Sequence, residues 1–324
     1  MKEFFCRAYG GPEVLGLREV EQPAPKADEI LVRIVATTVN SADVRMRAAR
    51  FPKGMGLIGR LALGVSKPRQ PVLGTELAGI VTAAGRDVRR FKVGDKVFAF
   101  PGIKLGCHAE FRILHERQRV FPKPDNLSFS EAASISFGGT TALHFIRKAA
   151  LHAGEKILVI GASGAVGAAM VQIAKHIGAK VSAVTSAGNA DLVKSLGAAK
   201  VIDYRHENFA DNGETYDVIA ETTGTHTFRS CRNSLRKGGR FLAIAAGVPD
   251  MLAMIWSSAL YGKQVIAGPA GESEALVQQV GEWAQAGILK PVIDRRYPFR
   301  QLPEAHAYVD TGRKRGSVVI EVAT

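Results

Sequence analysis

The sequence predicts an α/β chain in which a β-rich first third precedes a doubly wound parallel sheet. In the first third, short β-branched runs such as Ile30–Val39 and Gly79–Ala83 alternate with Gly, Pro and Asp, which is typical of antiparallel strands or a small barrel. From Lys156 onward, continuous apolar strands alternate with helices. That alternation predicts a parallel sheet covered on both faces. From about Ile293 the chain returns to β character.

The elements follow from local patterns. Helices are expected from Ser130, over Thr140–Ala150, over Gly164–Ile177 and, briefly, over Asp191–Leu196. Strands are expected over Lys96–Phe100, Lys156–Gly161, Lys180–Thr185, Lys200–Tyr204, Tyr216–Glu221 and Arg240–Ala245. The Gly-, Pro- and Arg/Lys-rich stretch Arg45–Arg69 has weak periodicity. We expect a surface loop there, or a flap over a substrate mouth.

Composition restricts the class of protein. The 324 residues are 46% hydrophobic and 23% charged, which excludes wholesale disorder and allows a large core without metal or disulfide support. Lys and Arg exceed Asp and Glu by 43 to 30, a formal charge of +13 that favours anionic ligands or surfaces. The three cysteines, Cys6, Cys107 and Cys231, are widely spaced. This spacing suits a reducing compartment, and we expect a cytoplasmic location.

One segment resembles a membrane span. Ile157–Ala174 contains no charged residue and approaches the length needed to cross a bilayer. Glycines and a serine interrupt it, and its two halves have different periodicities. We therefore expect a buried strand, a turn and a helix there. The N-terminal MKEFFCRAYGG has no continuous apolar core and no small-residue cleavage site, so no secretory signal is expected.

The motif that indicates chemistry is GASGAVG, Gly161–Gly167, between a buried strand and an amphipathic helix. In a dinucleotide-binding fold this turn lets a pyrophosphate approach the backbone where a Cβ would block it. The helix N-terminus then offers free N–H groups to the phosphates. We expect cofactor contacts at Ser163, Gly164, Ala165 and Val166. The alternative is a glycine-rich packing turn without a ligand.

The end of the second strand of this region favours NADPH over NADH. NAD specificity normally uses a carboxylate there, but the sequence continues Thr185-Ser186-Ala187-Gly188-Asn189 with no acid before Asp191. Ser186 and Asn189 could donate hydrogen bonds to a 2′-phosphate. Tyr204 and Arg205, after the third strand, could reach the same phosphate, although Arg205 could equally be a solvated loop residue.

Several segments together resemble one family across nearly the whole chain. They are GTELAGIV from Gly74, VGDKVFAF from Val93, GGTTALHF from Gly138, GASGAVG, KSLGAAKVIDY from Lys194 and the terminal PEAHAYVDTGRKRGSVVIEV. The chain resembles the zinc-free quinone oxidoreductase (zeta-crystallin-like) group of the medium-chain dehydrogenase/reductases. The resemblance implies a GroES-like barrel built from residues 1–123 and 293–324, with a Rossmann dinucleotide-binding domain over residues 124–292.

The resemblance also bears on metals. Zinc-dependent relatives bind the catalytic metal through a Cys and a His, and the corresponding positions here are Asn40 and Thr75. Zinc needs several thiolate, imidazole or carboxylate ligands, and a four-cysteine structural loop is missing as well. Cys107-His108 with His115 is the one other cluster to consider, but its spacing fits no standard site. We expect no zinc.

Without a metal to polarise a carbonyl, hydride transfer needs an acceptor that is already electrophilic. We expect reduction of a quinone or an α,β-unsaturated carbonyl. By resemblance, Asn40 lies near the nicotinamide and the acceptor, Thr141 contacts the nicotinamide ribose, and Ala245 belongs to the cofactor contacts. Arg45 stands where several quinone reductases of this type have a tyrosine and is included as a catalytic candidate. For Asn40 and Thr141, a purely backbone-capping role is the alternative.

Two other functions stay open. One is a zinc-type alcohol dehydrogenase. The other is a non-catalytic NADPH-binding protein that associates with RNA or acidic membrane through the basic Arg45–Arg69 stretch, although aromatic residues to stack on bases are few there. No nucleic-acid or membrane partner is expected. The apolar run Met251–Gly262 and the following QVIAG suggest a homodimer, with packing inside the chain as the alternative.

Overall fold

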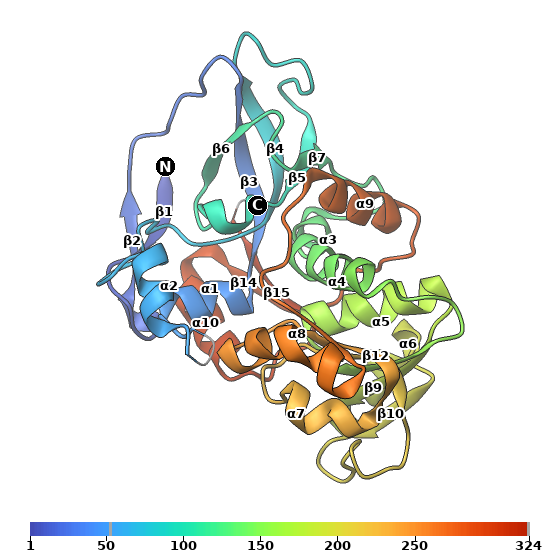
Figure 1. The fold of residues 1–324 in the computed structure, drawn as a ribbon. Coiled ribbons are helices and arrows are strands. Elements are labelled where there is room, and N and C mark those ends of the chain that lie inside the picture. Colours follow the sequence, from blue (N-terminus) through green and yellow to red (C-terminus); the bar gives the residue numbers. More distant parts are fainter. Residues whose placement is uncertain (52–53, 323–324) are drawn as a thin grey trace.

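The computed structural model describes residues 1–51 and 54–322. These residues form two large sheets. A third, two-stranded antiparallel sheet consists of β1 (Lys2–Cys6) and β2 (Leu15–Glu19). In Figure 1 the parallel sheet with its helices occupies the lower right, and the antiparallel strands rise above it. The α/β class expected from the sequence is confirmed.

The first large sheet has seven strands, taken from both ends of the described chain. Its order is β14-β15-β3-β4-β5-β7, with β6 also paired to β3, and every pair except β14 with β15 is antiparallel. The strands are β3 (Glu29–Val39), β4 (Leu77–Ala84), β5 (Lys96–Ala99), β6 (Phe111–His115), β7 (Val120–Pro122), β14 (Ile293–Pro298) and β15 (Ser317–Glu321).

The second large sheet has six parallel strands in the order β10-β9-β8-β11-β12-β13. The strands are β8 (Lys156–Ile160), β9 (Lys180–Thr185), β10 (Lys200–Asp203), β11 (Tyr216–Glu221), β12 (Leu235–Ala243) and β13 (Gln264–Ala267). The chain moves outward from β8 in one direction and then in the other. The order therefore reverses between β8 and β11, which is where such sheets bind ligands.

Alternate side chains of these strands enter two separate cores. Ile157 and Val159 pack with residues of α4 (Ser136–Ala149), α5 (Ala165–Ile177) and α9 (Glu274–Gln285). Leu158 and Ile160 pack on the other face with α7 (Phe228–Cys231) and α8 (Val248–Tyr261). Because both faces are covered, the central strand β8 is apolar and buried from Ile157 to Ile160, as the sequence indicated.

The membrane-like run Ile157–Ala174 is resolved into β8, a turn and the start of α5, as expected. Among the described residues, no helix has the length and apolar composition needed to cross a bilayer.

Several helices were not expected from the sequence, among them α7, α8 and α9, and two others lie where a loop or β structure was expected. The stretch Arg45–Arg69, expected as a loop, contains α2 (Gly56–Leu63), and the C-terminal β region contains α10 (Leu302–Asp310). The remaining helices are α1 (Ser41–Arg47), α3 (Phe129–Ala133), α6 (Ala190–Leu196) and the short 3-10 turns Pro12–Val14, Gly102–Lys104, Ala187–Asn189, Arg232–Ser234 and Phe299–Gln301. Pro52 and Lys53, within the expected flap, lie outside the described residues.

The apolar run Met251–Gly262 forms most of α8, beside the edge strand β13. Its alternative assignment, a segment packed inside the chain, is wrong for most of its large side chains. Ile255 is 80% exposed and Leu260 is 69% exposed. Leu252, Met254, Trp256 and Tyr261 are also exposed. An apolar helix face of this kind often marks an interaction surface.

Candidate functional site

The turn between β8 and α5 is built from closely packed backbone. Gly161 has a φ of +79°, in the left-handed region that favours glycine. A Cβ on Gly167 would lie 2.2 Å from the carbonyl oxygen of Gly161, so α5 can approach the turn only with glycine at that position. These two glycines are therefore required by the fold itself.

Gly164 differs from both. Its φ is −75°, and a Cβ there would meet only the Gly161 oxygen, at an ordinary 3.5 Å. It is the N-cap of α5 and makes no side-chain capping bond. The first-turn N–H groups of α5 are consequently available to an anion, as at other helix N-termini that bind phosphate.

Four polar side chains gather beside this turn. The Asn189 side-chain amide donates to Ser163 Oγ at 3.1 Å and to Ser186 Oγ at 3.2 Å, and Thr185 Oγ1 donates to Ser163 Oγ at 3.0 Å. The structure thus brings together the three predicted residues Ser163, Ser186 and Asn189. Thr185, which completes the group, was not among the predicted site residues. No carboxylate takes part in these hydrogen bonds.

Helix α4 lies against the first turn of α5. A Cβ on Gly138 would lie 2.5 Å from the Ala165 carbonyl oxygen, so the two helices touch through backbone. Thr141, one turn further along α4, is 7% exposed, and Val166 is 9% exposed. The predicted residues Thr141, Ala165 and Val166 therefore belong to one region.

Tyr204 follows β10 and is 60% exposed, and the Arg205 guanidinium lies 5.9 Å from the centre of its ring. The Tyr204 N–H donates to the Thr185 carbonyl oxygen at 3.4 Å. This contact keeps Tyr204 beside the strand end that carries Ser186.

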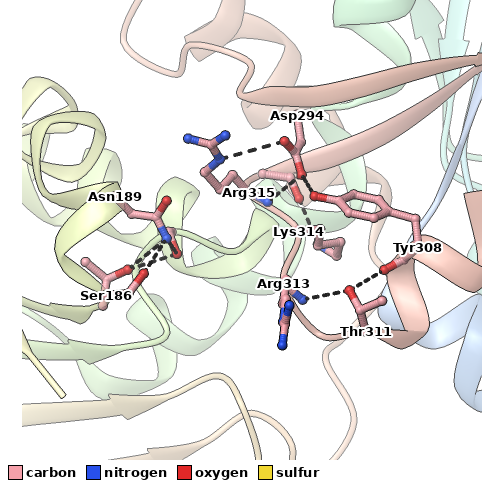
Figure 2. A network of polar contacts seen from close by, with 11 residues as sticks. Ser186, Asn189, Asp294, Tyr308, Thr311, Arg313, Lys314 and Arg315 are labelled. Atoms are coloured by element: carbon pink, nitrogen blue, oxygen red, sulfur yellow. Dashed lines mark hydrogen bonds and ion pairs between the residues drawn. The ribbon is translucent and has the colours of Figure 1, made fainter. Parts of the chain in front are cut away.

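The sequence reasoning missed the role of the C-terminal GRKRG segment, Gly312–Gly316. The Gly316 N–H donates to the Ser163 carbonyl oxygen at 2.7 Å, and Gly316 forms a parallel bridge with Gly164. The basic residues Arg313, Lys314 and Arg315 therefore adjoin the glycine turn. Figure 2 shows this basic segment and the Asn189 group in one view. The run of three cations before a strand was a visible signal.

Asp294 and Lys314 determine how this basic segment is arranged. Asp294 accepts the Arg315 N–H at 2.9 Å and the Tyr308 hydroxyl at 2.6 Å. Lys314 Nζ donates to the Gly316 carbonyl oxygen at 2.7 Å. Burial lowers the pKa of Lys314 to about 8, although the negative charges of Asp294 and Glu76 oppose the shift. The side chain of Arg313 makes no hydrogen bond or ion pair with any residue in the described part of the chain.

The ends of β11 and β12 lie at the other side of the strand reversal. Glu221 is 2% exposed and accepts the Thr223 N–H at 3.0 Å and the Gly224 N–H at 2.7 Å, which shapes the following loop. A Cβ on Gly224 would lie 3.4 Å from Ala245 Cβ and 4.0 Å from Arg45 Nη2. Arg45 of α1 thus reaches the loops of the parallel sheet beside Ala245, which was predicted to contact the cofactor.

Asn40 caps α1. Its side-chain oxygen accepts the N–H groups of Ala42 and Asp43, at 2.9 and 3.3 Å. Its amide nitrogen donates to Thr75 Oγ1 at 2.7 Å. The capping role considered from the sequence is therefore present, and Asn40 and Thr75 are in direct contact as the resemblance implied. Asn40 is 3% exposed and Thr75 is 4% exposed.

Two buried carboxyl groups lie behind this pair. Asp43 accepts N–H groups from Asn40 and Gly74, at 2.9 and 3.1 Å, and burial raises its pKa to about 7. Glu76 accepts the Thr38 hydroxyl at 2.5 Å and the Phe137 N–H at 2.6 Å. Burial is also the main cause that raises the pKa of Glu76 to about 8. The sequence reasoning did not single out either carboxyl group, although Glu76 directly follows Thr75.

Within residues 1–51 and 54–322, no three His, Cys, Asp or Glu side chains are placed to hold a metal ion. His108 contacts the Thr38 carbonyl oxygen at 3.0 Å, whereas His115 pairs with Asp28 at 3.1 Å. Cys107 is free and fully buried. The Cys107–His108–His115 cluster is therefore not assembled.

The strand order of the parallel sheet places the predicted cofactor-binding segments in one row along the carboxyl edge of the sheet. The Ser186–Asn189 segment follows β9, the glycine turn follows β8, and the Gly224 and Ala245 loops follow β11 and β12. A parallel sheet with a glycine turn at the strand reversal, joined to an antiparallel sheet that carries Asn40 and Thr75, defines a medium-chain dehydrogenase/reductase.

Comparison with known proteins supports this class. Residues 26–125 match the family described as alcohol dehydrogenase GroES-like domain, and residues 196–320 match the family described as zinc-binding dehydrogenase. The chain is 32% identical to 2-methylene-furan-3-one reductase from Solanum lycopersicum, over 99% of this chain and 79% of that protein. It is 29% identical to NADPH-dependent alkenal/one oxidoreductase from Arabidopsis thaliana, over 99% and 79% of the two chains.

The chain is also 30% identical to quinone oxidoreductase from Homo sapiens, over 94% of this chain and 92% of that protein. Among solved structures, a quinone oxidoreductase from Pseudomonas syringae pv. Tomato DC3000 superposes with a TM-score of 0.83 at 27% identity, covering 99% of both chains. The chain belongs to the quinone oxidoreductase family, the zinc-free branch of the medium-chain dehydrogenase/reductases. The resemblance identified from the sequence is confirmed.

Proposed function

We propose that this protein reduces a quinone or an α,β-unsaturated carbonyl with NADPH and without a metal. The observation that carries the proposal is the turn at Gly164. There is space beside its Cα, and the N–H groups of the first turn of α5 directly follow it. The relatives named as quinone oxidoreductase and as 2-methylene-furan-3-one reductase support the choice of acceptor.

The residues present fit a dinucleotide. The first turn of α5 would hold the diphosphate at Gly164, Ala165 and Val166, because among the described residues only the Gly161 oxygen comes within 4 Å of a Cβ placed on Gly164. Thr141 and Ala245 would contact the nicotinamide half. When bound, NADPH supplies the hydride.

Three features support NADPH over NADH. Ser186 and Asn189 present a hydroxyl and an amide where NAD-specific folds have a carboxylate. Tyr204 and Arg205 lie beside the same strand end. Arg313 adds a positive charge near the glycine turn. A hydrogen bond to a charged group contributes about 1.5–3 kcal/mol, so one lost contact to the 2′-phosphate would change the preference about tenfold or more.

At the acceptor end, Asn40 and Arg45 are the proposed groups that touch the substrate. The amide of Asn40 has a second N–H besides the one given to Thr75. The guanidinium of Arg45 offers further donors beside Ala245. Such donors stabilise the negative charge that develops on the acceptor oxygen during reduction. Solvent then protonates the reduced product.

Zinc-type alcohol dehydrogenase is the main competing function, because one matching family is described as zinc-binding. The amide and hydroxyl at Asn40 and Thr75 are poor zinc ligands compared with the thiolate and imidazole that zinc prefers. Metal analysis of protein purified without chelators separates the two functions. Stoichiometric zinc with turnover of saturated alcohols would establish the alternative.

The RNA- or membrane-binding alternative rests on the basic stretch Arg45–Arg69. Those charges do not form a single exposed face, because Arg47 is fully buried against Asp310 and Arg45 is half-buried. Lys53 lies outside the described residues. A charge-driven association would weaken steeply with added salt, so binding to RNA or anionic vesicles at raised salt would support that alternative.

The decisive experiment combines binding with turnover. Calorimetry with NADPH and NADH should give the tighter complex with NADPH. A panel of quinones, enones, aldehydes and saturated alcohols, followed by loss of NADPH absorbance, should show turnover of the first two groups. Protein that binds neither nucleotide, or that accepts only saturated alcohols, would contradict the proposal.

We also propose a division into residues 1–123 with 293–324 and residues 124–292, which the membership of the two large sheets supports. A homodimer through α8 and the edge strand β13 is proposed as well, since Ile255 is 80% exposed. Sedimentation should give twice the 34.7 kDa chain mass, and Ile255→Asp should shift it to one. The three free, buried cysteines support a reducing, cytoplasmic location.

A further inference from the structure

Arg45 differs from Arg47 of the same helix, and from Arg50 just beyond the helix, in having no ion-pair partner. Arg47 and Arg50 both pair with Asp310, Arg50 at 3.0 Å. The Arg45 side chain is half-buried. In contrast to Arg47 and Arg50, it makes no hydrogen bond and no ion pair with any of the described residues, 1–51 and 54–322. Its guanidinium N–H donors are therefore available to an anion that enters the site.

Glu221 does not form an ion pair with Arg45. Its negative charge acts on Arg45, but both of its oxygens accept hydrogen bonds from the loop that follows β11. Oε1 accepts from Thr223, and Oε2 accepts from Gly224 at 2.7 Å. Glu221 therefore anchors the Gly224 loop against which Arg45 rests, and the guanidinium remains free.

The location of Arg45 separates it from the expected diphosphate. Its Nη2 lies 4.0 Å from a Cβ placed on Gly224, beside Ala245. These loops follow β11 and β12, whereas the phosphate turn follows β8 and the ribose group follows β9. Neighbouring strands are about 4.8 Å apart. Arg45 thus stands at the nicotinamide end of the row, where the acceptor must lie, and the phosphates have their own site at α5.

We propose that Arg45 binds a carboxylate carried by the acceptor, so that the physiological substrates are anionic quinones or enones. The inference rests on the proposed function and adds the charge of the substrate to it. Arginine suits this role because its planar fork donates two parallel hydrogen bonds to a carboxylate. In a half-buried site that pairing also fixes the orientation of the acceptor over the nicotinamide.

The test uses two enones, acetylacrylate and its methyl ester, in which one methyl group removes the negative charge. The quantity measured is the ratio of their kcat/KM values with NADPH, in the wild type and in Arg45→Gln and Arg45→Lys. Loss of the charged hydrogen bonds should lower the acid-to-ester ratio about 10- to 100-fold in Arg45→Gln. Arg45→Lys should retain part of the preference, because it keeps the charge and loses the fork.

Arg50→Gln is the matched control. It removes one positive charge five residues away, from a side chain that is 59% exposed and already paired with Asp310. Its acid-to-ester ratio should change less than about threefold. Because the Arg45 side chain makes no hydrogen bond or ion pair with a described residue, Arg45→Gln should fold, and a thermal unfolding scan checks this.

The alternative source of the anion is the cofactor. A tenfold rise in the Kd of NADPH in Arg45→Gln, with an unchanged acid-to-ester ratio, would assign the anion to the cofactor and overturn the inference. An equal fall for both enones would also overturn it, because Arg45 would then serve only the carbonyl oxygen. Failure of the wild type to reduce either enone or benzoquinone would instead remove the proposed function itself.

Discussion

The two ends of the candidate site are built by different means. The phosphate end consists of backbone from one run of seven residues, Gly161–Gly167, and its shape depends on atoms that are missing from its glycines. The acceptor end consists of side chains from α1, the residues before β4, and the loops after β11 and β12. Close backbone packing restricts which residues the phosphate end can contain. The side chains of the acceptor end come from separate segments, so each can change without altering the others. The first end therefore defines the family, and the second can define the substrate.

The largest expected effect is that of Gly167→Ala. The new Cβ would lie 2.2 Å from a backbone oxygen that cannot move without displacing the turn. Overpacking of this kind costs about 3 kcal/mol or more, measured as a lower free energy of unfolding in urea. A variant as stable as the wild type would show that the turn is not sterically limited.

The buried carboxyl groups behind the acceptor end should make the free energy of unfolding depend on pH. The folded-state pKa of Glu76 is raised from 4.5 to about 8, so the folded protein holds a proton that the unfolded chain releases above pH 4.5. The stability contributed by this proton is present at low pH and is lost as the pH rises toward 8. Asp43, with a pKa of about 7, acts in the same direction.

Glu76→Gln removes the titration of this carboxyl group. The comparison runs from pH 6.5 to pH 8. Over this range His108 and His306 are neutral in the folded protein, because burial lowers their pKa values. Wild-type stability should fall more steeply with pH than that of the variant. The difference should reach about 2 kcal/mol, measured by urea unfolding at each pH. Parallel pH profiles would mean that Glu76 is ionised throughout.

Gly164→Ala tests the phosphate end without disturbing the fold. Its φ of −75° suits alanine, and the added Cβ meets only one atom at 3.5 Å. Stability should therefore change by less than about 1 kcal/mol, while NADPH affinity falls at least about tenfold because the Cβ occupies the approach of the diphosphate. Gly56→Ala, whose Cβ would have no neighbour within 4 Å, should leave the Kd of NADPH unaltered.

Asn40 tests the acceptor end through a modest change in stability. Asn40→Ala removes the cap of α1 and should cost about 1 kcal/mol. Asn40→Ser restores a capping oxygen but not the amide that contacts Thr75. If Asn40 also serves the acceptor, the serine variant should recover the melting temperature but not kcat. Recovery of both would reduce Asn40 to a helix cap.

The sequence predicted the phosphate end closely and the acceptor end only in part. The strand, the turn and α5 depend on neighbours within a few residues. The approach of Asn189 to Ser163 follows from the pairing of β8 with β9, which brings the two strand ends together. Glu76 could not be placed from spacing alone, because its partners Thr38 and Phe137 come from β3 and α4. Its burial is a property of the assembled fold.

The same distinction explains the two helices that lie where a loop or β structure was expected. Helix α2 lies in a stretch interrupted by Gly and Pro, and the large side chains Leu57, Ile58 and Leu61 are exposed. None of the residues of α2 is buried, so no core-facing apolar stripe marked this helix within the weak periodicity of the stretch. Helix α10 is short and separates two strands, and its buried His306 and Leu302 pack on the antiparallel sheet. Long-range packing stabilises it where local propensity is weak.

The hydrogen bond from Gly316 to Ser163 couples the unfolding of the antiparallel sheet to that of the parallel sheet. Gly316 directly precedes β15, the strand that lies between β14 and β3, and its N–H is donated to the nucleotide turn. Tightening that turn should slow amide hydrogen exchange in β15 as well as in α5. The protein should then unfold in a single cooperative step whose midpoint rises with dinucleotide concentration.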